Sequence, residues 1–202
     1  MIRKRLWNLV FHLGWENLHY FNKTESHFVS EPQYALLPKA NQGESLWDMG
    51  SSLGFYAAWA ATFPNNYRVI AFDISPRADR FLGKTIAANK LDGKVIIAHK
   101  PLTLYNTLYR PPLTAHQANS LTRGREQSIH LAQAIELYGS PAVIKMDIEG
   151  AEEEFLANPA FWEFIRSGKI KLFVECHSGQ AQVLCSQHGM TRHGGSNHWY
   201  LL

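Results

Sequence analysis

Residues 145–152, with the sequence Lys-Met-Asp-Ile-Glu-Gly-Ala-Glu, place alternating charges directly after an apolar run. The run Ala142 to Met146 is dominated by residues that favour β-structure, which predicts a central strand. Because side chains alternate faces along a strand, Lys145, Asp147 and Glu149 would project to one side if the extended backbone continues. Ionisable groups at the carboxyl end of a parallel strand lie where open α/β sheets carry out their chemistry.

The alternative interpretation is that these acids only begin a helix. Gly150 would end the strand, and the acids after it would stand in the first turn of a helix, where the helix dipole favours negative charge. We assign chemistry to Asp147 and Glu149, and the helix-start role to Glu153 and Glu154.

A second charged strand end, Glu175-Cys-His177, follows the apolar run that begins at Lys171. Glu175 and His177 alternate onto one face, and they would meet the first motif if the two strands are neighbours. Histidine with carboxylates suits a general base or a hard metal ion. The alternative is a helix cap with a buried ion pair between Lys145 and a carboxylate. The converging group would be Asp147, Glu149, Glu175 and His177, and we assign no metal to it, although a divalent ion stays an open alternative.

The stretch Asp48-Met-Gly-Ser-Ser-Leu-Gly54 joins a predicted strand, 45–48, to a predicted helix, 53–63. Gly50 would permit a tight turn and close approach to a ligand, and Gly54 would let the helix pack near the strand. The loop differs from the dinucleotide pattern G-x-G-x-x-G because an acid stands where that pattern begins. An acid there suits a cationic or hydroxyl-rich ligand better than a pyrophosphate.

Asp73 ends the next predicted strand, about 25 residues after Asp48. A carboxylate at this place holds ribose hydroxyls in nucleotide-type sites. The alternative is a helix cap for the segment that begins at Pro76. The two acids together, with a helix between them, indicate a binding site more strongly than either does alone.

Other chemistries find no support in the sequence. It lacks the P-loop and C-x-x-C patterns. Two cysteines make no disulfide framework, Cys176 is expected to be a buried thiol, and a reducing, cytoplasmic setting is the default. The histidines other than His177 are scattered, and we expect most of them to be surface or packing residues.

The elements that must position these residues alternate along the chain. Apolar runs predict strands over 45–48, 68–73, 94–99, 142–146 and 171–176, and helical spacing predicts helices over 31–38, 53–63, 78–90, 128–137, 152–166 and 180–188. This alternation predicts an α/β fold with a mostly parallel sheet and right-handed crossovers. Gly194-Gly195 separates two short β-like segments, so the chain is expected to end in a hairpin.

Two segments fall outside this alternation. Residues 101–126, rich in Pro, Arg, Tyr and small polar residues, are expected to form a lid over the acceptor, the molecule on which the site would act. The basic and apolar start, Met1 to Leu13, is expected to be an amphipathic helix that packs on its own domain, with membrane-surface or partner contact as the alternative. We therefore expect an N-terminal helical segment, 1–42, and one domain, 43–202.

The composition is that of an ordinary globular protein. Its 202 residues are 46% hydrophobic and 18% charged, enough for one domain with a full core. The formal net charge of +3 is too small to indicate a nucleic-acid partner. No apolar run is long enough to span a bilayer.

Taken together, these motifs resemble the FkbM family of S-adenosylmethionine-dependent methyltransferases. The resemblance covers about residues 43–202 and rests on Asp48–Gly54, Ala71–Pro76, Lys145–Glu152 and Val174–His177, the third being the most specific. It implies the class I methyltransferase (Rossmann-like) fold: a mostly parallel seven-stranded sheet, helices on both faces and a C-terminal antiparallel hairpin.

The resemblance also implies roles for individual residues. Asp48, Gly50, Ser52 and Gly54 would line the methionine side of S-adenosylmethionine, Asp73 would bind its ribose hydroxyls, and Phe55 and Ile74 would contact it nearby. The sequence departs from the family pattern at Ser51-Ser52, where Ala-Asn is usual, and at Asp73, where Glu is commoner. Residues 99–102 also lack the usual small and acidic residues, which leaves the adenine edge open.

The implied reaction is O-methylation of a sugar or another hydroxyl-bearing small molecule, in which positioning dominates. Asp147 would be the base or would orient the acceptor. The groups that tune it would be Lys145, Glu149, Glu175 and His177. Rival functions are a non-catalytic cofactor-binding scaffold, a ribose 2'-O-methyltransferase acting on RNA, which the small net charge disfavours, and a nicotinamide dehydrogenase, which the first loop disfavours.

Overall fold

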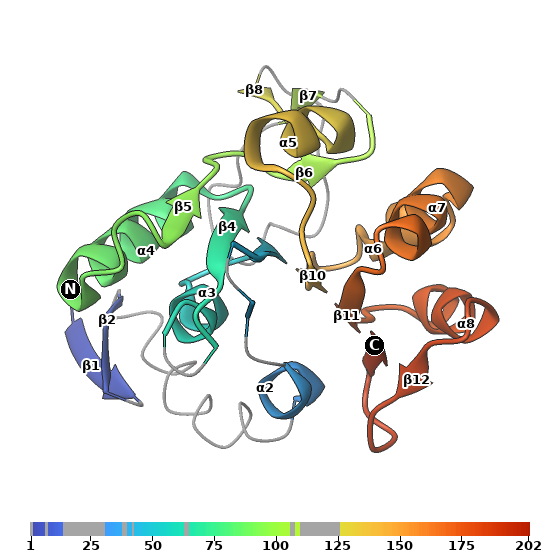
Figure 1. Cartoon of the computed structure of the whole chain (residues 1–202), viewed down its shortest axis with the longest axis horizontal. Helices are drawn as coiled ribbons and strands as arrows, with labels where there is room; N and C mark the ends of the chain where they lie inside the picture. Colours follow the sequence, from blue (N-terminus) through green and yellow to red (C-terminus); the bar gives the residue numbers. More distant parts are fainter. Residues whose placement is uncertain are drawn as a thin grey trace.

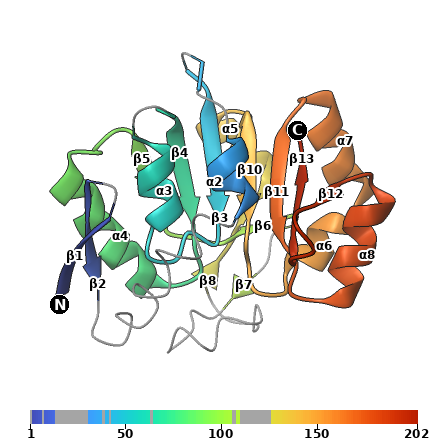
Figure 2. The same cartoon turned by 90° about the horizontal axis from the view of Figure 1, so that it is seen from below.

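The structure is a computed structural model that describes residues 2–6, 8–13, 31–37, 40–41, 43–62, 65–105, 108–109 and 126–202. Its centre is a seven-stranded sheet with the order β12-β13-β11-β10-β3-β4-β5 (Figures 1 and 2). The strands are β3 (Ser45–Met49), β4 (Arg68–Phe72), β5 (Val95–Ile97), β10 (Val143–Met146), β11 (Lys171–Glu175), β12 (Thr191–Arg192) and β13 (His198–Leu201).

The sheet has the predicted topology. Strands β5, β4, β3, β10 and β11 are parallel, β13 pairs antiparallel with β11, and β12 pairs antiparallel with β13. The expected terminal hairpin is thus present and forms one edge of the sheet. Strand β10 lies between β3 and β11, so the carboxyl ends that carry three of the four predicted motifs are adjacent.

Helices cover both faces of the sheet because the inner strands are apolar on both sides. Leu46 and Val69 point into one core, with α3 (Phe55–Ala60) and α4 (Pro76–Asn89), whereas Trp47 and Ile70 point into the other. The second core includes residues of α5 (Leu131–Tyr138), α6 (Glu152–Leu156), α7 (Pro159–Ser167) and α8 (Gly179–Gln187). Figure 1 shows α3 and α5 on opposite sides.

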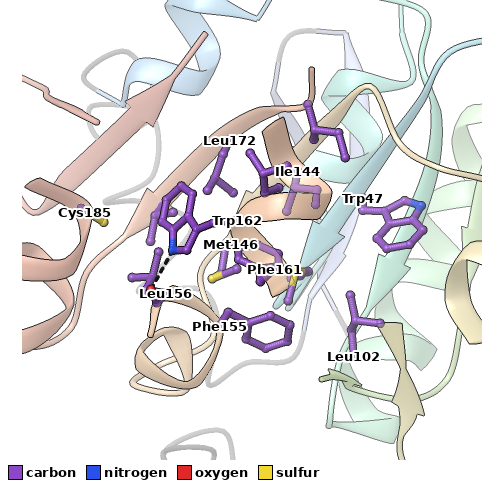
Figure 3. Close-up of a cluster of buried hydrophobic side chains, with 14 of the residues drawn as sticks. Trp47, Leu102, Ile144, Met146, Phe155, Leu156, Phe161, Trp162, Leu172 and Cys185 are labelled. Atoms are coloured by element: carbon purple, nitrogen blue, oxygen red, sulfur yellow. Dashed lines mark hydrogen bonds between the residues drawn. The ribbon is translucent and has the colours of Figure 1, made fainter. Parts of the chain in front are cut away.

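The second core is built from large side chains that the helices supply to the strands. Phe155, Phe161 and Trp162 pack beneath Ile144 and Met146 of β10 (Figure 3). The indole N–H of Trp162 donates to the carbonyl oxygen of Leu156 at 2.7 Å, which satisfies a fully buried donor. This packing anchors α6 directly after the motif that β10 carries.

One predicted helix is two. We expected a single helix over 152–166, but α6 ends at Leu156 and α7 begins at Pro159. Proline is favoured in the first turn of a helix and disrupts its interior. Asn158 caps α7, since its Oδ1 accepts the N–H groups of Ala160 at 2.8 Å and Phe161 at 3.3 Å.

The amphipathic helix predicted at the N-terminus is wrong. The strands β1 (Ile2–Leu6) and β2 (Leu9–Leu13) instead pair as an antiparallel hairpin, and Asn8 before β2 has a φ of +68°. Asparagine tolerates this left-handed conformation better than most residues. Strand β2 packs on α4, because Asn89 bonds both the N–H and the carbonyl of Val10 at 2.7 Å. Among residues 1–42 the described helix is α2 (Pro32–Leu36), as predicted there.

The region predicted as a lid is described only in part. It contributes β6 (Leu102–Thr103), β7 (Leu108–Tyr109) and β8 (Glu126–Gln127), and β9 (Ile129–His130) follows directly before α5. Residues 106–107 and 110–125, which carry most of the expected acceptor contacts, lie outside the described residues. Within the described part of the chain, none of the helices combines the length and apolar character that a membrane crossing requires.

Candidate functional site

The loop after β3 is held in a conformation that only glycine permits at its centre. Gly50 has a φ of +79°, and a Cβ built there would lie 1.7 Å from the backbone oxygen of Asp147. Gly54 has a φ of +78°, and its Cβ would lie 2.2 Å from Leu82 of α4. The loop therefore lies against the end of β10 on one side and against α4 on the other, so both glycines are needed for close approach.

Asp73 holds the same loop from the neighbouring strand. Its two carboxylate oxygens accept the N–H groups of Ser52 and Ser75, each at 2.7 Å. Burial raises the pKa of Asp73 to about 6, although both N–H groups favour the ionised form. Ser75, not Asp73, caps α4, since its Oγ accepts the N–H of Ala78 at 3.4 Å. Asp73 therefore lies at a strand end facing the first loop, where the sequence placed it.

The candidate site has two halves: the first is Asp48 with the loop after β3 and Asp73, and the second is the group of charged residues after β10 and β11. Lys145 joins them. Its Nζ lies 3.3 Å from Oδ1 of Asp48 and 3.3 Å from Oδ2 of Asp147, and it donates to the carbonyl oxygen of Gly50 at 3.1 Å. Burial alone would lower the pKa of Lys145, but the carboxylates of Asp48 and Asp147 outweigh it and raise the pKa. The lysine is thus a buried cation that links the end of β3, the loop after β3 and the loop after β10.

Asp48 is the most deeply buried acid of the first half. Its side chain has no solvent exposure, its Oδ1 is paired with Nζ of Lys145, and its Oδ2 has no hydrogen-bond partner among the described residues. The Oγ of Ser51 is also buried and has no hydrogen-bond partner among the described residues. Burial raises the pKa of Asp48, while Lys145 opposes the rise. Buried polar atoms without partners are costly, and they are common where a ligand supplies the partner.

The second half centres on His177, as the convergence of the two strands predicted. Its Nδ1 lies 2.8 Å from Oε1 of Glu152. Its Nε2 faces three further carboxylates, at 3.7 Å from Asp147, 3.6 Å from Glu149 and 3.9 Å from Glu175. The hydrogen bond with Glu152, with the nearby charges of Asp147 and Glu149, raises the pKa of His177 to about 9 despite its burial.

Glu175 is fixed by residues of the C-terminal hairpin. Asn197 donates to its Oε1 at 3.0 Å, and Nε2 of His198 lies 3.5 Å from its Oε2. Burial alone would raise the pKa of Glu175, but these partners lower it to about 2. The antiparallel register sets this contact, since Glu175 is opposite His198.

Three of these side chains have the spacing of a metal site. One ligand atom each of Asp147, Glu175 and His177 lies within 4.8 Å of the others. Carboxylate and imidazole groups suit divalent cations, but a histidine ligand must be neutral, and the surrounding carboxylates favour its cation. We read the cluster as an ion-pair network and assign no ion to it.

Sequence reasoning missed three members of the site. Glu152 stood inside the first motif, yet its buried contacts depend on α6 folding back on the loop. His198 was grouped with the scattered histidines, although the terminal hairpin was a signal that could have found it. Glu31 precedes α2, and burial, with nearby Glu175 and Asp147, raises its pKa to about 7. No signal in the sequence brings Glu31 to the sheet.

The positions of Phe55 and Ile74 do not by themselves indicate whether these residues bind a cofactor, as the sequence predicts. The ring of Phe55, at the start of α3, lies 4.7 Å from that of Phe11 in the N-terminal hairpin. Ile74 is half-buried beside Asp73. The cysteines are both buried as free thiols, with their sulfurs 3.5 Å apart, as expected for Cys176.

Comparison with known proteins identifies proteins that the chain resembles in sequence and in fold. No protein-family model matches the chain. In sequence it is similar to the hexuronic acid methyltransferase AglP of Haloferax volcanii, with 30% identity over 129 residues that cover 60% of this chain and 52% of the relative. The match to this curated relative thus spans about half of its length.

Solved structures of methyltransferases are also similar to this chain, at lower sequence identity. The methyltransferase FkbM from Methylobacillus flagellatus KT has a TM-score of 0.57 and 14% identity, over 87% of this chain and 48% of that one. The METTL16 methyltransferase domain has a TM-score of 0.51 and 10% identity, over 96% and 72%. The chain therefore has the class I methyltransferase fold, and FkbM-type methyltransferases are the proteins that it resembles in both its motifs and its chain path.

Proposed function

We propose that this chain is an S-adenosylmethionine-dependent O-methyltransferase that acts on a hydroxyl group of a sugar. The observation that carries the proposal is the two-part site along adjacent strand ends. The buried Asp48 at the end of β3 and the buried Ser51 in the loop after it form one part, and a carboxylate–histidine cluster at the ends of β10 and β11 forms the other. The buried Lys145 connects them.

The first half fits S-adenosylmethionine chemically. The Oδ2 of Asp48 and the Oγ of Ser51, which lack a hydrogen-bond partner among the described residues, suit an ammonium group, and Asp73 offers a carboxylate to vicinal hydroxyls. The residues that would hold the cofactor are Asp48, Gly50, Ser52, Gly54, Phe55, Asp73 and Ile74. When bound, S-adenosylmethionine supplies an electrophilic methyl group on a sulfonium.

The second half would act on the acceptor. Asp147 is partly exposed, with 28% of its side chain accessible, so it can contact an acceptor hydroxyl as well as Lys145. It would orient that hydroxyl and take its proton as the oxygen is methylated. Lys145 and His177 both lie beside the carboxylate of Asp147, at 3.3 Å and 3.7 Å, and would hold it in place toward the acceptor.

The acceptor class follows from the relative and from the site. AglP is named as a hexuronic acid methyltransferase, which supports a uronic acid or another hydroxyl-rich carbohydrate as the acceptor. Carboxylates beside an exposed His177 are groups that bind sugar hydroxyls.

Calorimetry with S-adenosylhomocysteine, followed by a turnover assay with uronic-acid glycosides, tests the proposal. We expect binding to the wild-type chain and to D147N, and we expect D147N to lose activity by about two orders of magnitude or more. D73N should weaken cofactor binding instead. Binding without turnover for any hydroxylated acceptor would favour the scaffold alternative, and full activity of D147N would remove Asp147 from the chemistry.

A further inference from the structure

Glu152 makes more hydrogen bonds within the site than a helix-start acid requires. Its side chain has no solvent exposure. Oε1 accepts the N–H of Ile148 at 3.0 Å, and Oε2 accepts the N–H of Gly150 at 2.8 Å. Oε1 also lies 2.8 Å from Nδ1 of His177. One carboxylate thus joins the loop after β10 to the end of β11.

These contacts decide which way the imidazole of His177 faces. Both oxygens of Glu152 are acceptors, so Nδ1 must carry a hydrogen to bond with it. The ring then has only Nε2 left for the rest of the site. Nε2 lies 3.6 to 3.9 Å from carboxylate oxygens of Glu149, Asp147 and Glu175, close enough to feel their charge but too far for a direct hydrogen bond.

We propose that Glu152 is a positioning residue: by accepting the Nδ1–H of His177, it fixes the imidazole so that Nε2 is presented to Asp147 and the acceptor. The inference rests on the proposed methyl transfer, in which Asp147 contacts the acceptor. A fixed ring of this kind parallels the carboxylate that orients a catalytic histidine in other enzymes.

The charges around His177 support a cationic ring in this orientation. The groups that face it are Asp147 and Glu149 from the loop after β10, Glu152 from α6 and Glu175 from β11, with Lys145 and His198 behind them. A cation at this position places positive charge 3.7 Å from the carboxylate of Asp147, the group that would contact the acceptor.

The competing role for Glu152 is structural only. The two N–H groups that it accepts would hold the loop even if His177 were absent, and Glu149 in that loop has a φ of +53°. A structural role predicts that removing the charge lowers stability without changing the protonation of His177. The two roles therefore differ in what happens at the histidine ring.

Nitrogen-15 NMR of the full chain reads the ring directly. The His177 signals are assigned by comparison with H177Q, and the wild-type chain should show a slowly exchanging Nδ1–H at neutral pH. A neutral ring at pH 7 that carries its hydrogen on Nε2 would overturn the proposal. Because the readout comes from the wild-type chain, it needs no turnover, and H177Q serves only to assign the signals.

Substitution then tests the consequence, with E154Q as the matched control on the exposed face of the same helix. An amide has one acceptor oxygen, so E152Q cannot serve all three N–H groups. We expect E152Q to lose the Nδ1–H signal and about tenfold in kcat, with S-adenosylhomocysteine binding retained. E154Q should change none of these.

Failure of the inference and failure of the proposed function are distinguishable. E152Q that melts at lower temperature but keeps the wild-type signals of His177 would make Glu152 structural and overturn the inference. A chain that shows the Nδ1–H signal and binds S-adenosylhomocysteine, yet methylates no hydroxyl acceptor, would instead contradict the proposed function.

Discussion

At the residue scale, the site depends on close backbone approach as much as on charged side chains. Gly50 brings the first loop against the carbonyl of Asp147, and Lys145 donates to the carbonyl of Gly50. The predicted cofactor and acceptor halves are therefore in contact through main-chain atoms. A change at Gly50 should disturb both halves at once.

We predict that G50A is strongly destabilising. The new Cβ would lie 1.7 Å from the oxygen of Asp147 at a φ of +79°, so the loop or the strand end must move. Strain and displacement together should cost about 3 kcal/mol or more, measured by chemical denaturation. S-adenosylhomocysteine binding should be lost as well.

Gly43 provides the matched control for that prediction. It has a φ of +85°, but a Cβ there meets nothing within 4 Å. G43A should therefore show only the backbone penalty of about 1 kcal/mol and bind the cofactor normally. Equal losses in the two variants would mean that the contact with Asp147 is unimportant.

At the element scale, the sequence predicted what continuous apolar runs and strong stop signals determine. Strands β3, β4, β10 and β11 are buried on both faces, so their apolar runs were distinctive. The N-terminal segment was ambiguous because Leu6, Leu9, Val10 and Leu13 have helical spacing. In the hairpin, Leu6 is paired with Leu9, and the buried residues contact α4 and α3.

The residues of the site also divide into those that the sequence predicted and those that it did not. Asp147, Glu175 and His177 could be predicted because they follow parallel strands that are neighbours. Glu31 could not, because its place depends on how α2 packs, and His198 could have been found only by pairing the predicted terminal hairpin with the strand that ends at Glu175. The contact of His198 with Glu175 follows from the register of β13 on β11, which pairs these two residues directly.

We predict that the N-terminal hairpin depends on Asn89. Its side chain bonds both backbone groups of Val10, at 2.7 Å, and the carbonyl of Thr85, also at 2.7 Å. N89A should cost about 1–3 kcal/mol, because the partners are partly buried and lose their bonds. Hydrogen exchange should show faster exchange at Val10, with the amides of β10 unchanged.

K90A, at the next position of the chain, is the control for N89A. Lys90 is an exposed residue that follows the last turn of α4. Exchange at Val10 should match the wild type in K90A. If N89A left exchange at Val10 slow, the docking of the hairpin would rest on its apolar contacts alone.

At the scale of the whole molecule, the site makes the stability of the fold depend on pH. The pKa of His177 is about 9 in the folded chain, against an ordinary value of 6.5. A histidine with a raised pKa stabilises the fold fully below pH 6.5, and this contribution is lost as the pH rises through 9. Because the histidine is only 24% exposed, its contribution should reach about 2 kcal/mol after solvent screening.

Denaturation of wild type and H177Q across pH 6 to 10 measures that contribution, because titrating groups that do not interact with His177 cancel in the difference. The difference in unfolding free energy should be largest near pH 6 and should shrink by about 2 kcal/mol toward pH 10. Glu31, whose pKa is raised to about 7, contributes to both proteins alike. A difference that stays constant with pH would mean that His177 titrates near its ordinary value, and the carboxylates around it would then not act as its partners.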